Sequence, residues 1–179
     1  MGKLGKPDNA LLFIAFAYQK ERALDELEKI AIRPFGDIFR KSGSYPFAYS
    51  GYYQAEMGPG LQKLFVIYKN LYSIENAVKT KLSAIEIEQQ TAMKGKRTIN
   101  IDPGYLTLAK LVLSTTKNFD HRVYLGQGVF ADVQLRYRGG EFVANSWTYP
   151  DYREESTFAF LENARSYLHQ LVKQDEANL

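Results

Sequence analysis

The densest group of reactive side chains lies in the sequence KNFDHRVYL, residues 117–125. Lys117, His121 and Arg122 stand within six residues, directly before an apolar run that is typical of a strand. If residues 117–121 form a loop, these three side chains can converge on one ligand. His121 would then act as a general acid or base near neutral pH, and Arg122 would bind a carboxylate or phosphate through two hydrogen bonds. This chemistry favours an anionic or phosphorylated small molecule, such as a nucleotide, and a hydrolysis or transfer reaction.

The same residues also have a structural interpretation, which stays open. Neighbouring side chains in a strand point to opposite faces of the sheet. His121 and Arg122 could therefore not share a pocket if the strand already began at residue 121. In the structural interpretation, residues 117–121 are a loop whose Asp120 pairs locally with Arg122 or Lys117, at the polar start of a strand.

Asp102 also has two interpretations. The sequence Asp102-Pro103-Gly104 predicts the start of a helix that ends near Thr116, because Asp is a preferred N-cap and Pro is favoured at the first helical position. Alternatively, Asp102 ends a strand where open sheets bind ligands, and takes part in catalysis with His121. A carboxylate there would repel a bare phosphate, so a phosphate ester would require Mg²⁺ between them.

Glu56 and Asp132 could join Asp102 as metal ligands. Glu56 precedes a Gly-Pro-Gly turn. Asp132 belongs to a predicted strand in which every second residue shares its face, and this polar face either meets solvent or lines a cleft.

The sequence WTYPDY, residues 147–152, predicts an aromatic loop before the last helix. Trp147 and Tyr149 could stack on a base or another ring of a ligand. They could equally pack as a lid over the sheet edge.

The hydrophobic pattern predicts the elements that must position these residues. Strands are expected at 11–18, 45–56, 61–69, 98–101, 122–125, 129–136 and 141–147, and helices at 20–32, 74–93, 103–116 and 154–173. On the second helix, Ala77, Val78, Leu82 and Ile85 are expected to face inward. The order predicts a single α+β domain over residues 1–179, with a mixed or mainly antiparallel sheet flanked by helices. It opens with the ferredoxin-like order β-α-β-β-α-β.

The composition excludes several classes of function. The chain of 179 residues has no cysteine, which removes disulfides, thiolate metal sites and cysteine nucleophiles. A net charge of +3 is too small to imply nucleic-acid binding. No apolar run is long enough for a membrane span, and no small-residue cleavage site follows the apolar N-terminal run, so a cytoplasmic protein is expected.

Four strings in the sequence resemble a bacterial family of unknown function, the family numbered 4416. They are EMG (56–58), NIDPGY (100–105), KNFDHRVYL (117–125) and WTYPDY (147–152), and the resemblance covers nearly the whole chain. Members are often labelled GTP-binding protein, so the resemblance implies a nucleotide ligand. The chain contains no G-x-x-x-x-G-K-[ST] sequence, and an ordinary P-loop site is therefore not expected.

A second function class also fits the sequence. Exposed tyrosines and the 147–152 loop would serve a non-catalytic module that binds a protein or RNA partner. A homodimer joined through a sheet edge is compatible with either class.

Overall fold

A single antiparallel sheet runs through the computed structural model, which describes residues 5, 7–19, 24–47 and 56–177. The strand order is β2-β4-β1-β5-β6-β8-β7, with β3 beside β4 and β9 beside β8. The strands are β1 (Ala10–Gln19), β2 (Ile38–Lys41), β3 (Tyr45–Pro46), β4 (Leu61–Tyr72), β5 (Ile99–Leu106), β6 (Lys110–Thr115), β7 (Val123–Gly126), β8 (Val129–Arg138) and β9 (Glu141–Ala144). An α+β fold with an antiparallel sheet is thus confirmed.

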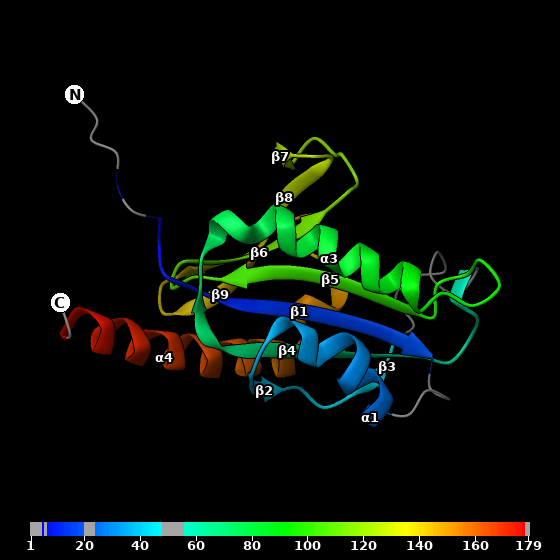
Figure 1. The fold of residues 1–179 in the computed structure, drawn as a ribbon. Coiled ribbons are helices and arrows are strands. Elements are labelled where there is room, and N and C mark those ends of the chain that lie inside the picture. Colours follow the sequence, from blue (N-terminus) through cyan, green and yellow to red (C-terminus); the bar gives the residue numbers. More distant parts are fainter. Residues whose placement is uncertain (1–4, 6, 20–23, 48–55, 178–179) are drawn as a thin grey trace.

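Helices cover both faces of this sheet (Figure 1). They are α1 (Leu24–Leu27) with its continuations η1 (Glu28–Ile32) and η2 (Arg33–Phe35), η3 (Ile74–Asn76) leading into α3 (Ala77–Gln90), and η4 (Pro150–Arg153) leading into α4 (Glu155–Ala177). Alternate side chains of the buried strand β1 serve the two cores. Ile14 packs on the side of α1, η1 and α3, and Phe13 packs on the side of α4.

Residues 99–115 form a β-hairpin, so the helix predicted at 103–116 is wrong. The side chain of Thr107 closes the turn, because its hydroxyl accepts the N–H groups of Ala109 and Lys110 at 3.2 and 3.1 Å. Gly104 lets β6 approach β5 closely, since a Cβ there would lie 2.2 Å from the Val112 carbonyl oxygen. The residues that imitate a helix start therefore serve close strand packing.

The other predicted elements agree with the structure to different degrees. The strands at 11–18, 61–69, 122–125 and 129–136 and the helices at 74–93 and 154–173 are confirmed within a few residues, and the strand predicted at 141–147 ends at residue 144. The helix predicted at 20–32 is helical from residue 24, and residues 20–23 lie outside the described residues. The strand predicted at 45–56 is seen only as β3, and most of its remainder, 48–55, also lies outside them. Strand β2 was not predicted.

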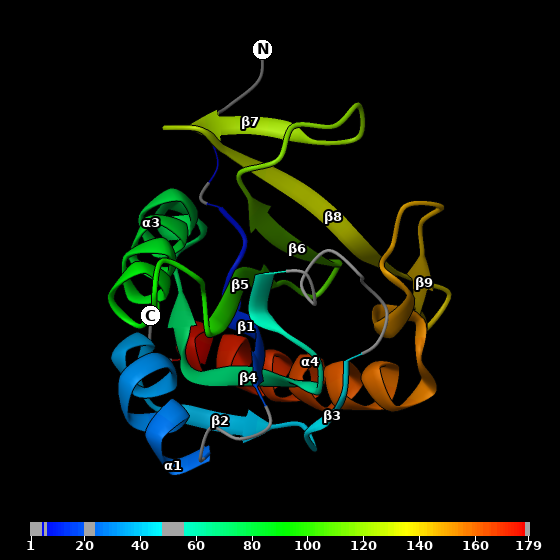
Figure 2. The same ribbon diagram turned by 90° about the vertical axis from the view of Figure 1, so that its right-hand side faces the viewer.

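The sheet splits between β5 and β6. Their pairing extends only from Leu106–Leu111 to Gly104–Leu113. Residues 99–103 of β5 stay paired with β1, whereas β6 continues with β8. Figure 2 shows β6, β8 and β7 turning away from the rest of the sheet. The split leaves one side of β5 without a strand partner, next to α3.

Candidate functional site

Two charged side chains of α3 take the place of the missing strand partner. Glu88 accepts the backbone N–H of Ile101 at 2.6 Å, and Lys81 donates to the carbonyl oxygen of Ile101 at 2.9 Å. Lys81 and Glu88 are seven residues apart and so lie on one side of the helix. Lys81 also contacts the Asp102 carboxylate at 3.3 Å. Both α3 side chains are buried, and this face of the helix therefore carries charge into the interior.

A pocket of about 180 Å³ lies in this split. Helix α3, strands β5, β6 and β8, and the loops that follow α3, β6 and β9 contribute its walls. The lining side chains are mainly polar or charged: Lys81, Ile85, Glu88, Arg97, Asn100, Asp102, Leu113, Ser114, Thr115, Thr116, Lys117, Asp132 and Tyr149. Four residues predicted from the sequence, Asp102, Lys117, Asp132 and Tyr149, thus meet at one place.

Arg97 links Glu56 to the pocket. Its guanidinium donates to both carboxylate oxygens of Glu56, at 2.8 and 2.6 Å, and to Asn100 Oδ1 at 2.9 Å. Asn100 in turn donates to Asp102 Oδ2 at 2.7 Å. The hydrogen bonds from Arg97 lower the pKa of the Glu56 carboxyl, although burial opposes them. Glu56 therefore neutralises the guanidinium of Arg97.

The pKa values of the two carboxyl groups near Lys81, those of Asp102 and Glu88, are shifted in opposite directions. Burial opposes ionisation of Asp102, but Lys81, Lys63 and Asn100 outweigh it and hold the pKa of that carboxyl below its usual value. Burial raises the pKa of the Glu88 carboxyl, and Lys81, the Ile101 N–H and Arg97 offset this only in part. One pocket thus contains a carboxylate that keeps its charge and another that binds a proton more readily than usual.

Residues 116–122 form a loop, and Arg122 fixes it to β8. Arg122 Nε donates to Asp132 Oδ2 at 2.8 Å, and its two remaining nitrogens donate to the Lys117 carbonyl and the Tyr149 hydroxyl at 2.9 and 3.0 Å. Gln134 donates to the other oxygen of Asp132 at 2.8 Å. The guanidinium of Arg122 therefore holds the loop and Tyr149 in place, and its donors point to protein groups.

His121 does not line the pocket but contacts Asp132, which does. Its Nε2 is 3.6 Å from Asp132 Oδ2 and its Nδ1 is 3.1 Å from Asp120 Oδ1. The ring stacks between Phe119 and Trp147, with centroid distances of 5.9 and 5.0 Å. His121 and Arg122 do converge, as the loop interpretation predicted, but they converge on Asp132.

The aromatic loop at 147–152 is held by carbonyl groups of β8. Trp147 Nε1 donates to the Val133 carbonyl at 2.9 Å, and the Thr148 hydroxyl donates to the Gln134 carbonyl. Gln134 also accepts the backbone N–H of Tyr149 at 3.0 Å through its side chain. The loop is therefore a rigid support that brings Tyr149 to the pocket.

The structure separates the predicted site residues into three groups. Asp102, Lys117, Asp132 and Tyr149 line the pocket, Arg122 and Glu56 bind residues that line it, and His121 and Trp147 stack beside it. The predicted metal ligands Glu56, Asp102 and Asp132 do not form one cluster. The described residues contain no group of three or more Asp, Glu, His or Cys side chains that could hold a metal ion.

Sequence reasoning missed Lys81, Glu88 and Arg97. The buried residues of α3 are Ala77, Lys81, Ala84 and Glu88, whereas Ala77, Val78, Leu82 and Ile85 were expected to face inward. Of the four residues expected to face inward, only Ala77 is buried. The missed signal is the repeat of small alanines and opposite charges at positions 77, 81, 84 and 88, which places a charged pair on the inner face.

A larger hollow of about 610 Å³ lies elsewhere, between residues 40–45 and the start of α4. Its walls include Ser42, Gly43, Ser44, Ser156 and Thr157. None of the residues predicted to be functional lines this hollow. We therefore take the smaller pocket in the sheet as the candidate site.

The protein therefore combines an α+β fold with a small, charged pocket at the split in its antiparallel sheet. The model of a family described as a domain of unknown function, DUF4416, matches residues 8–167. The chain belongs to this family. No curated protein and no solved structure is similar enough to count as a match. Within the described residues, no helix has the length and apolar character needed to cross a membrane.

Proposed function

We propose that the chain binds a compact phosphorylated small molecule in the pocket between α3, β5 and β6. The observation that carries the proposal is the meeting of Asp102, Lys117, Asp132 and Tyr149 at this pocket. These residues come from three of the four strings that resemble the family, and from β8. The fourth string supplies Glu56, which binds Arg97 in the pocket wall.

The charges around the pocket support a functional role, because buried ion pairs often contribute no more to stability than apolar residues of the same volume. Three cations and three carboxylates nevertheless line this pocket: Lys81, Arg97 and Lys117 with Glu88, Asp102 and Asp132. A ligand that uses these charges gives a reason for keeping them.

The donors suit the oxygens of a phosphate group. The Lys81 ammonium has three N–H groups, and Ile101 and Asp102 occupy two of them. Lys117, Ser114, Thr115 and Thr116 line the side of the pocket that β6 and the loop after it form. A phosphate that contacts both groups of donors would receive charge-assisted hydrogen bonds from each. The wall charges are balanced, so directed hydrogen bonds rather than net attraction would select the ligand.

The size of the pocket restricts the ligand. A volume of about 180 Å³ corresponds to roughly six water molecules. That is enough for a phosphate group and a few further atoms, but not for a whole nucleotide. The base of a nucleotide would therefore lie outside, where Trp147 offers a ring that is 40% exposed.

A panel of thermal-shift measurements tests this proposal. Inorganic phosphate, glycerol 3-phosphate, GTP, GDP and ATP are each added with and without Mg²⁺. A compound at one hundred times its dissociation constant adds about 2.7 kcal/mol, which raises the melting temperature of a domain of this size by roughly 5–10 °C. Lys117→Met should lose the shift, and Lys173→Met, on the exposed side of α4, should keep it. Absence of any shift, or an equal shift in Lys117→Met, would contradict the proposal.

A second candidate function is self-association through β7. This last strand of the sheet is unusually apolar for an edge, with Val123 67% and Tyr124 61% exposed. A second copy pairing along β7 would bind the unpaired backbone groups on the outer edge of this strand. Light scattering after size-exclusion chromatography should then show a dimer that Val123→Lys dissociates. A monomer at high protein concentration would argue against it.

We also infer that the first elements form a ferredoxin-like unit. The chain order β1, α1, β2, β4, α3, β5 and the antiparallel neighbours β2-β4-β1-β5 support this reading. An experimental structure in which β1 does not lie between β4 and β5 would contradict it.

A further inference from the structure

We propose that the pocket hydrolyses phosphate monoesters, with Asp102 as the general base and Glu88 as the general acid. This inference rests on the proposed binding of a phosphorylated molecule. Both carboxylates line the same pocket. They are also attached to one short segment of β5, since Glu88 binds the N–H of Ile101 and Asp102 is the next residue. The acid role expected for His121 therefore falls to Glu88, because His121 does not line the pocket.

Lys81 binds the same short segment of β5 as the two carboxylates. It contacts Asp102 Oδ1 at 3.3 Å and the carbonyl oxygen of Ile101 at 2.9 Å, and Glu88 accepts the N–H of that same residue. A phosphoryl group bound to its third N–H would have one carboxylate near each side. In-line displacement requires this arrangement, because the attacking and leaving oxygens lie on opposite sides of phosphorus.

The electrostatic surroundings support the division of roles. The charged groups facing Glu88 are Lys81, Arg97 and Asp102, and the Ile101 N–H also binds it. Burial outweighs the cations and raises the pKa of Glu88, whereas Lys81, Lys63 and Asn100 lower that of Asp102 against the effect of burial. Environments that push two pKa values apart are the usual mark of an acid and base pair. A bound phosphate dianion would raise the pKa of Glu88 further.

The reaction balances without an additional reactant. Asp102 takes a proton from a water molecule, and the water oxygen forms a bond to phosphorus. The bond between phosphorus and the ester oxygen breaks, and that oxygen takes the proton of Glu88 to leave as an alcohol. Inorganic phosphate is the second product. A proton then returns from Asp102 to Glu88 through solvent, which restores both groups.

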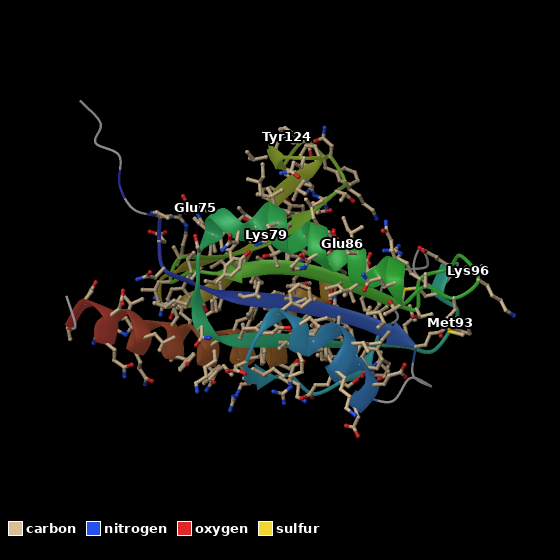
Figure 3. The ribbon with its side chains drawn as sticks, viewed as in Figure 1. Glu75, Lys79, Glu86, Met93, Lys96 and Tyr124 are labelled. Carbon is tan, nitrogen blue, oxygen red and sulfur yellow. The ribbon has the colours of Figure 1, made fainter. Side chains whose placement is uncertain are left out.

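Leaving groups of different basicity test the two roles in the full-length protein. The substrates are p-nitrophenyl phosphate, whose leaving group departs without a proton, and phenyl phosphate, whose leaving group benefits from one. Asp102→Asn should lose about 10²–10⁴-fold in kcat/KM on both substrates. Glu88→Gln should lose a similar factor on phenyl phosphate and less than about tenfold on p-nitrophenyl phosphate. Glu86→Gln, an exposed change on the same helix (Figure 3), should keep both activities.

Each contrary result has a separate meaning. A wild-type protein that gains thermal stability with inorganic phosphate but hydrolyses neither ester would overturn the hydrolysis and leave the binding proposal standing. Equal losses of Glu88→Gln on both substrates would show that Glu88 acts only on structure, and would remove it as the acid. The phosphate-induced thermal shift of each variant reports whether the pocket is still folded. A wild-type protein with neither a shift nor activity would overturn both proposals.

Discussion

Arg122 donates to Asp132 at 2.8 Å while both side chains are almost fully buried, at 3% and 2% exposure. Removing one partner of such a pair leaves an uncompensated charge inside the protein. We therefore expect Arg122→Ala to lower the free energy of unfolding by about 3–5 kcal/mol. Urea denaturation of the purified variant measures this value. A loss below about 1 kcal/mol would show that Asp132 finds another partner.

The double variant Arg122→Met, Asp132→Leu provides the control. It removes both charges and fills their space with apolar atoms, so it should regain most of the stability that Arg122→Ala loses. Double-mutant analysis separates the pair from its neighbours.

Lys81 should stabilise the split in the sheet through its bonds to Ile101 and Asp102. Lys81→Met keeps the side-chain length but leaves a buried carbonyl oxygen without that donor. A loss of about 1–3 kcal/mol is expected. Lys79→Met, an exposed change on the same helix, should stay within about 0.5 kcal/mol (Figure 3). Equal effects of the two substitutions would mean that the Lys81 bonds do not matter.

Gly104 should be intolerant of any side chain. In Gly104→Ala the new Cβ would lie 2.2 Å from the Val112 carbonyl oxygen and 2.9 Å from Leu113 Cδ2. The strands β5 and β6 must then move apart, and a loss of about 1–3 kcal/mol follows. Gly43→Ala, where a Cβ meets nothing within 4 Å, is the matched control. Thermal unfolding of both variants measures the difference, and a Gly104→Ala variant as stable as Gly43→Ala would refute the close packing.

The Glu56–Arg97 pair predicts a dependence of stability on pH. Hydrogen bonds from Arg97 lower the pKa of Glu56 below its usual value of 4.5. The unfolded chain therefore binds the proton first, and the contribution of Glu56 is complete well above pH 4.5 and lost as the pH falls through the lower folded value. Glu56→Gln should flatten the part of the stability profile that lies below the usual pKa of a glutamate. Parallel profiles of wild type and variant would exclude the pair as the cause.

The alternation of apolar residues was enough to predict most strands and the two long helices. It was not enough for residues 102–116, because Asp-Pro-Gly has the local chemistry of a helix start. The pairing of β5 with β1 and the packing of β6 against Gly104 make this segment a hairpin instead. Local propensity is overridden here by a contact that the sequence does not display.

Only part of the candidate site could be predicted, because the rest depends on contacts between segments that are distant in the sequence. Asp102, Lys117, Asp132 and Tyr149 were recognised as candidate site residues from their types and their places on predicted strands and loops, and they do meet. Arg122 and His121 were recognised too, but their shared partner Asp132 could not be known without the β6–β8–β7 pairing. Lys81 and Glu88 were missed because charges on a helix normally face solvent. They face inward because the split strand offers them a free N–H and carbonyl.

We propose the pocket in the split sheet as the ligand site. Titration of the isotope-labelled protein with inorganic phosphate, followed through its backbone amide resonances, tests this most directly. The largest shifts should fall on residues 114–117 and 100–102, and Lys117→Met should abolish them. Shifts confined to residues 40–45 and 156–160, which line the larger hollow, would contradict binding in the split sheet, and so would a spectrum that phosphate leaves unchanged.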